Sequence, residues 1–181
     1  LNAATNLTGV EIINVPAGGT LTLTAAQFLQ LADGDIDGAT GANLIITDLT
    51  QADVDAGFDL SEVNGFASIT ISLGEPSVDL GTFDTNGALV PGSDAVLNGA
   101  QFVLAAGQTL GLVNFDQANG LDVNGDANTT IVYKFADLET SVFPTVNQID
   151  ASGYNVTVLK ALAASFSGVP DSNVEFSIDD L

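Results

Sequence analysis

Five residue types are missing from this 181-residue chain: Arg, His, Cys, Met and Trp. Without His or Cys there is no imidazole base, no thiolate nucleophile, no disulfide framework and no ordinary zinc or copper site. Cationic side chains are also scarce, because only Lys134 and Lys160 stand against 23 Asp and Glu residues, and the formal net charge is −21. Such a surface repels phosphate and anionic lipid. We therefore expect no nucleic-acid partner.

Long apolar runs are missing too. No stretch approaches the ~20 apolar residues that a membrane helix needs, so we expect no insertion into a bilayer. Hydrophobic residues nevertheless make up 46% of the chain, which excludes a disordered acidic tail and predicts a packed core. The sequence starts at Leu1 without an initiator Met. We expect either a mature form or a fragment of a longer protein, and we favour the fragment.

The plentiful polar groups are oxygens of Asp, Glu, Asn, Thr and the backbone, which form the ligand set of Ca²⁺. The supply of residues therefore favours a secreted, calcium-binding protein over an enzyme. A halophilic cytosolic protein is the alternative explanation of the acidity. The chain has no nucleophile elbow, no phosphate-binding Gly-Lys loop and no dinucleotide fingerprint, so we assign no catalytic or cofactor-binding residue.

The two halves of the chain resemble each other. The segment Leu7–Leu23 matches Leu97–Leu112 with one residue deleted, and the separation of paired residues drifts from 90 near the start to 87 near the end. Ile13 pairs with Val103 in this alignment, before the deletion. Steady offsets across whole halves indicate a duplication. We predict two repeat units, residues 1–90 and 91–181.

Each unit alternates short strand-like and helical segments. Three helices are predicted: one capped by Thr24 over Ala25–Ala32, one capped by Thr50 over Gln51–Ala56, and one over Leu159–Phe166. The strand predictions rest on Val, Ile, Leu and Thr enrichment. They are Val10–Val15, Leu21–Thr24, Leu44–Thr47, Ala67–Leu73, Val78–Phe83, Gln101–Leu104, Leu110–Asn114, Thr130–Phe135, Tyr154–Leu159 and Val174–Ile178.

Apolar anchors within these strands recur at the length of one solenoid rung, 20–30 residues. In the first unit they lie 23 and 25 residues apart, and in the second 21 and 25 apart. The anchors are Leu21, Leu44 and Ile69, then Leu110, Ile131 and Val156. We predict a mainly β fold, a parallel β-solenoid resembling a right-handed β-helix with a few short helices, in which both units pack as one continuous solenoid. Two tandem β-sandwich modules are the alternative, because several Asn-Gly pairs suit hairpins.

Two acidic segments are predicted to bind metal. Asp33, Asp35 and Asp37 have the spacing of ligand positions one, three and five of an EF-hand loop, with Gly38 at the turn position. The second unit offers a similar set 89 residues later, formed by Asp122, Asn124 and Asp126. The bidentate Glu of position twelve is missing from both, so we expect weak Ca²⁺ sites and no EF-hand fold. The alternative is that Asp, Asn and Gly simply build exposed turns.

The string LTGVEIINVPAGGTLTLTAAQ, Leu7–Gln27, resembles repeat units of large bacterial S-layer proteins and of calcium-dependent, type I-secreted (RTX-adhesin-like) surface proteins. The resemblance implies a secreted right-handed β-solenoid that is ordered by Ca²⁺ and assembled at the bacterial cell surface. The GGxGxD nonapeptides of RTX calcium rolls are absent, so no ligand positions carry over.

Two functions follow as hypotheses. The first is a structural component of an S-layer, a filament or an adhesin stalk, which would associate with copies of itself or with neighbouring repeats. The second is an extracellular module that binds carbohydrate, ice or a host protein. Thr20, Thr22 and Thr24 alternate along one predicted strand and would share a face with Thr129 of a neighbouring rung.

Overall fold

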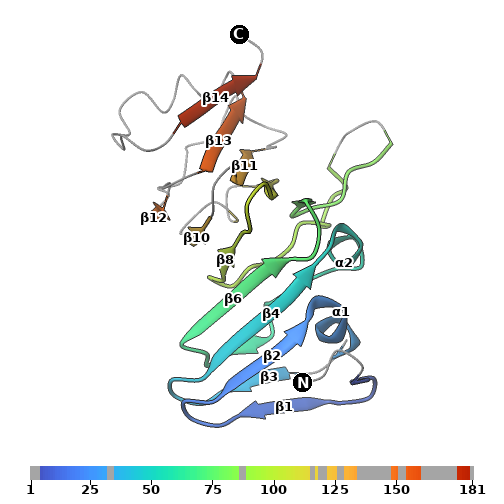
Figure 1. Cartoon of the computed structure of the whole chain (residues 1–181). Helices are drawn as coiled ribbons and strands as arrows, with labels where there is room; N and C mark the ends of the chain where they lie inside the picture. The colour runs from blue at the N-terminus through green and yellow to red at the C-terminus, as the bar shows by residue number, and fades with distance from the viewer. Residues whose placement is uncertain are drawn as a thin grey trace.

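The computed structural model describes residues 5–31, 35–85, 89–114, 117, 122–125, 129–133, 148–150, 154–159 and 175–179. The chain is mainly β, with two short α-helices and one 3₁₀ turn among these residues (Figure 1). The helical segments are α1 (Ala25–Phe28), the 3₁₀ turn Leu29–Leu31 and α2 (Gln51–Asp55). No described helix is long and apolar enough to cross a membrane.

The strands form three open parallel sheets of three, six and five strands. The three-stranded sheet contains β1 (Ile12–Val15), β3 (Asp35–Gly38) and β5 (Val63–Asn64). The six-stranded sheet contains β2 (Thr20–Thr24), β4 (Asn43–Leu49), β6 (Ser68–Leu73), β8 (Gln101–Val103), β10 (Asp122–Asn124) and β12 (Gln148–Asp150). The five-stranded sheet contains β7 (Ser77–Asp79), β9 (Thr109–Leu112), β11 (Thr129–Tyr133), β13 (Tyr154–Leu159) and β14 (Glu175–Asp179).

All pairs between these strands are parallel. The one antiparallel contact among the described residues is an isolated bridge between Phe83 and Leu89. Parallel neighbours cannot be joined by a two-residue hairpin and need a longer crossover. The pair Asn64-Gly65 therefore serves as a corner, where Gly65 has a φ of 74° between β5 and β6. The antiparallel pairing of tandem sandwiches does not occur between the strands of these sheets.

The predicted anchors lie in register. Leu21 pairs with Leu44 and Leu44 with Ile69 in the six-stranded sheet. Leu110 pairs with Ile131 and Ile131 with Val156 in the five-stranded sheet. Both ladders were expected from spacing alone, because a fixed rung length returns equivalent apolar residues to one position of the core.

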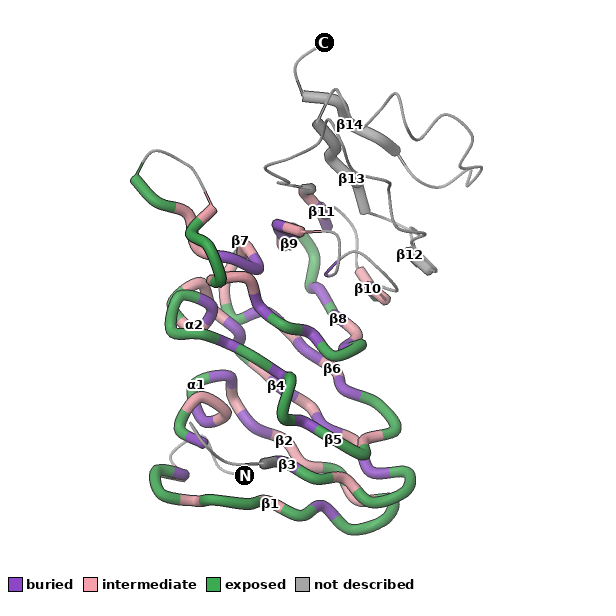
Figure 2. Tube along the Cα trace, turned by 180° about the vertical axis from the view of Figure 1, so that it is seen from behind, coloured by how far each residue is buried: buried purple, intermediate pink, exposed green. Residues whose placement is uncertain are grey.

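The core is one continuous cluster that runs through both halves, from Leu7 to Ile131. Buried positions alternate with more exposed ones along β4 and β6, as the tube in Figure 2 shows. Strand pairing also crosses the expected boundary between residues 90 and 91, because β6 pairs with β8 and β7 pairs with β9. The two halves are thus joined by the six-stranded sheet, by the five-stranded sheet and by a shared core.

Both predicted helix caps are confirmed, and the third predicted helix, Leu159–Phe166, lies outside the described residues except for Leu159, which ends β13. The Thr24 side chain accepts a hydrogen bond from the N–H of Gln27, whose side chain in turn accepts one from the N–H of Thr24. Thr50 and Asp53 form the same reciprocal capping box at α2. Each box satisfies two backbone donors at the N-terminus of a helix. Helix α1 ends earlier than predicted, at Phe28, and continues as the 3₁₀ turn.

Two buried glutamines, one in each half of the chain, make similar hydrogen bonds. The side chain of Gln27 donates to the carbonyl of Thr5 at 3.0 Å, while that of Gln117 donates to the carbonyl of Ala95, also at 3.0 Å. Gln27 also accepts a hydrogen bond from the backbone N–H of Thr24, and Gln117 accepts one from the backbone N–H of Val113. With so few cationic side chains, neutral amides satisfy these buried carbonyls.

Burial differs between the aligned strands β1 and β8. Ile13 and Val15 are the inward residues of β1, whereas in β8 Phe102 is buried and Val103 is 40% exposed. The two strands lie in different sheets, so the pairing of Ile13 with Val103 stays a prediction.

Candidate functional site

The predicted metal-binding segments are strands where the structure describes them. Asp35 and Asp37 lie in β3, and Asp122 and Asn124 lie in β10. Asp33 and Asp126 lie outside the described residues. The backbone at these four positions is thus extended and does not form the expected loop. Among the described residues, no group of three or more acidic side chains is placed to hold a metal ion.

The physical reason is the apolar residue in the middle of each segment. Ile36 and Val123 are almost completely buried, at 1% and 0% exposure. Burying such a side chain stabilises the chain by about 1.5–3 kcal/mol, which holds its neighbours in a strand. The period-two pattern of Asp-Ile-Asp and Asp-Val-Asn was the signal for a strand.

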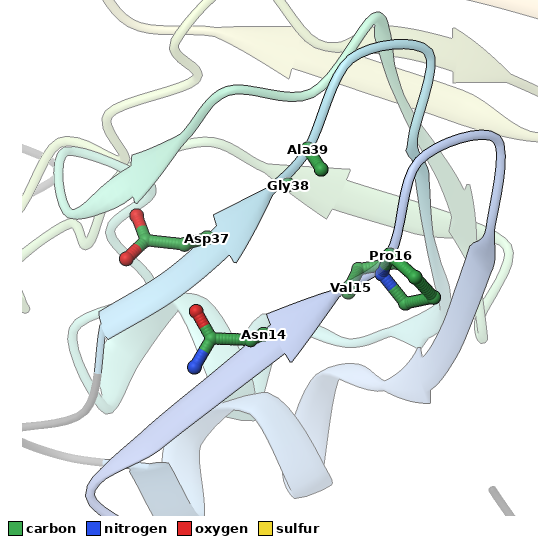
Figure 3. Close-up of a pocket in the computed structure, with 6 residues that line it drawn as sticks. All are labelled: Asn14, Val15, Pro16, Asp37, Gly38 and Ala39. Atoms are coloured by element: carbon green, nitrogen blue, oxygen red, sulfur yellow. The ribbon is translucent and has the colours of Figure 1, made fainter.

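The neighbours that the fold gives Asp37 are asparagines on adjacent strands. Asn14 of β1 and Asn64 of β5 are its register partners on the two sides, and all three residues are exposed. Figure 3 shows the side chains of Asn14 and Asp37 on the same side of β1 and β3. Paired strands are ~4.8 Å apart, which is closer than alternate residues along one strand. The sequence analysis missed Asn14 and Asn64, although their rung spacing could have found them.

These residues border a shallow hollow at the ends of β1 and β3, lined by Asn14, Val15, Pro16, Asp37, Gly38 and Ala39 (Figure 3). Gly38 is required here because the ring of Phe66 packs against it, and a Cβ would lie 2.9 Å from that ring. The hollow offers one carboxylate and one amide, a set suited to weak contacts with a cation or a hydroxyl group.

The second copy differs at the corresponding place. The carboxylate of Asp122 accepts a hydrogen bond from the side chain of Gln101 at 3.0 Å, across β8 and β10. Asn124 is exposed and is the register partner of Val103. The two predicted sites therefore have different polar neighbours. A metal at either remains a prediction.

The predicted threonine face is the outer side of β2, which carries Thr20, Thr22 and Thr24. Thr129 is not part of it. Thr129 lies in β11 of the five-stranded sheet, is fully buried and donates its hydroxyl to the carbonyl of Ala105 at 3.4 Å. Its expected place beside Thr20 is wrong because β11 pairs with β9 and β13. Asp48 of β4 is exposed and charged, and the remaining outward positions of β2, β4 and β6 are uncharged. They are Thr20, Thr22, Thr24, Asn43, Ile45, Thr47, Ser68, Thr70 and Ser72.

Comparison of the chain with protein-family models, curated proteins and solved structures found no match.

A calcium titration tests the metal prediction. At ten times its dissociation constant, a ligand of the folded state stabilises it by about 1.4 kcal/mol, so the melting temperature should rise by about 3–6 °C. We expect this rise at millimolar Ca²⁺ and a smaller one in Asp37→Asn, measured by differential scanning calorimetry. Mg²⁺ at equal concentration controls for general screening of the −21 charge. An unchanged melting temperature at millimolar Ca²⁺ would exclude both sites.

Proposed function

We propose that this chain is a structural component of a secreted bacterial cell-surface assembly, such as an S-layer, a filament or an adhesin stalk. The observation that carries the proposal is the continuity of the stack: successive parallel strands share one core across both halves. Such an arrangement grows in one dimension, and each added rung buries the apolar residues of the last. A protein that acts as a spacer, separating other parts of a surface assembly, needs such an elongating architecture.

The finer form of the proposal is a right-handed parallel β-solenoid in which the units 1–90 and 91–181 follow one another. In-register anchors and the repeated glutamine hydrogen bonds at Gln27 and Gln117 support it. The high negative charge suits an assembly that forms outside the cell, where Ca²⁺ offsets repulsion between carboxylates and so stabilises the folded chain.

Labelling of intact cells tests this location. An antibody raised against the chain should bind the surface of unbroken source cells, and a chelator such as EDTA should reduce the labelling if Ca²⁺ holds the assembly. An antibody against a cytoplasmic protein is the control for cell integrity. Labelling that appears only after lysis would contradict the proposal.

A second candidate is an extracellular binding module, favoured by the outer face of β2, β4 and β6, on which Asp48 is the one charged residue. A flat, preformed array of hydroxyl groups suits a neutral ligand, such as a carbohydrate, ice or a polar surface of a host protein. A glycan array and an ice-affinity assay distinguish it from a spacer. Binding by the wild type that is lost in Thr70→Lys, but retained in Ser61→Lys on an exposed loop, would favour this candidate.

A further inference from the structure

The described residues contain three Asn-Gly pairs, Asn64-Gly65, Asn98-Gly99 and Asn124-Gly125. Asparagine in such a pair can lose its side-chain amide, because glycine has no side chain to hinder the approach of its backbone nitrogen. That nitrogen attacks the Cγ atom of asparagine and closes a succinimide ring, while the side-chain nitrogen leaves as ammonia. Water then opens the ring and leaves aspartate or isoaspartate. The reaction needs only water, so the folded structure decides where it occurs.

The amide of Asn98 is held in place by the fold. Its side-chain nitrogen, which is the leaving group, donates to the carbonyl of Val63 at 2.7 Å and to that of Leu60 at 3.3 Å. A backbone hydrogen bond at 2.9 Å closes the turn 97–100, in which Asn98 has a positive φ of 47°. Attack on the Cγ atom of Asn98 must break the side-chain hydrogen bonds and open this turn.

The amide of Asn64 is held less firmly. Asn64 is exposed and is the last residue of β5, a strand of two residues at one edge of the three-stranded sheet. Its side chain makes one hydrogen bond to another described residue, a donation at 3.2 Å to the carbonyl of Glu62, which lies two residues earlier on the exposed surface. Water therefore reaches the Asn64 side chain, and little has to break before it reacts.

We propose that Asn64-Gly65 is a site of spontaneous chemical modification, at which Asn64 becomes aspartate or isoaspartate in the folded chain while Asn98 stays intact. This inference goes beyond the structural function and does not depend on it. Asn124 also ends a short strand, β10, and is exposed, so the same reasoning assigns it to the reactive pairs.

The modification changes both charge and geometry at a packed corner. Asp37 is the register partner of Asn64 on β3, and paired strands are ~4.8 Å apart. A new carboxylate beside Asp37 places two like charges opposite each other, which destabilises a sheet. Isoaspartate also inserts an extra backbone carbon before Gly65, at a corner where the carbonyl of Gly38 leaves no space for a Cβ. We therefore expect the modified chain to melt at a lower temperature.

Incubation of the purified chain at mildly alkaline pH, followed by peptide mass spectrometry, tests the proposal. Cleavage after acidic residues places Asn64 and Asn98 in separate peptides, 63–75 and 95–116. Because Asn98 must first lose its two side-chain hydrogen bonds, Asn64 should react about tenfold faster or more. Asn64→Gln should remove the mass increase from peptide 63–75, since the longer side chain closes a larger ring less readily.

The unfolded chain provides the matched reference. Both asparagines follow a branched apolar residue, Val63 or Leu97, and precede glycine, so in denaturant they should react at similar rates. Equal rates at Asn64 and Asn98 in the folded chain would overturn the proposal. So would an Asn64 that stays intact in the folded chain for as long as the unfolded chain takes to react completely. The structural function is tested separately, by the labelling of intact cells.

Discussion

Replacing Gly65 with alanine should lower the free energy of unfolding by about 3 kcal/mol, because two penalties act together. Gly65 has a φ of 74°, a left-handed conformation that costs other residues about 1–2 kcal/mol. A Cβ at this position would also overlap the carbonyl oxygen of Gly38, which belongs to the stacked corner of the preceding rung. Relief of such a clash requires backbone movement, at a cost of about 1–3 kcal/mol.

Gly92 is the matched control for this substitution. It has the same φ of 74°, but a Cβ there would meet no atom within 4 Å. Gly92→Ala should therefore show the conformational penalty alone, about 1–2 kcal/mol. Denaturant unfolding monitored by circular dichroism measures both variants. Equal losses for Gly65→Ala and Gly92→Ala would show that the corners at Gly38 and Gly65 do not pack against each other.

Replacing Gln117 with leucine should lower the free energy of unfolding by about 3–5 kcal/mol, since each unsatisfied buried group costs about 1–3 kcal/mol. Gln117 is 3% exposed and its side chain makes three hydrogen bonds to the backbone. It accepts from the N–H of Val113 at 2.9 Å and donates to the carbonyls of Leu80 at 2.6 Å and Ala95 at 3.0 Å. Leucine has a similar volume but leaves these groups unpaired.

Gln30→Leu is the control for this substitution, because Gln30 is exposed and accepts one hydrogen bond, from the N–H of Leu7 at 2.8 Å. Its replacement should cost about 0.5–1.5 kcal/mol. Gln27→Leu should resemble Gln117→Leu, since both residues are buried and both side chains hydrogen-bond to the backbone as donor and acceptor. A loss at Gln117 no larger than that at Gln30 would mean that its hydrogen bonds do not hold the two halves together.

Most of the strand content could be predicted from the sequence. Each of the ten predicted strands overlaps an observed one, and the anchors found by spacing lie in register. Four strands were missed: β3, β5, β10 and β12. They have two to four residues each. A segment of Asp and Asn around one Ile or Val has the composition of a turn, and its period-two pattern was the one sequence signal for the strand that the buried Ile36 and Val123 hold in place.

The absence of His, Cys and Arg limits the chemistry of this chain, and that limit follows from the sequence alone. The sequence also determined the rung length, because apolar anchors must return to one core. Tertiary structure decided which polar residues are neighbours. Asp37 lies beside Asn14 and Asn64, and Thr129 is buried away from the threonines of β2. The physical reason is that side-chain neighbours in a parallel sheet are set by strand register, which depends on the burial of residues far apart in the chain.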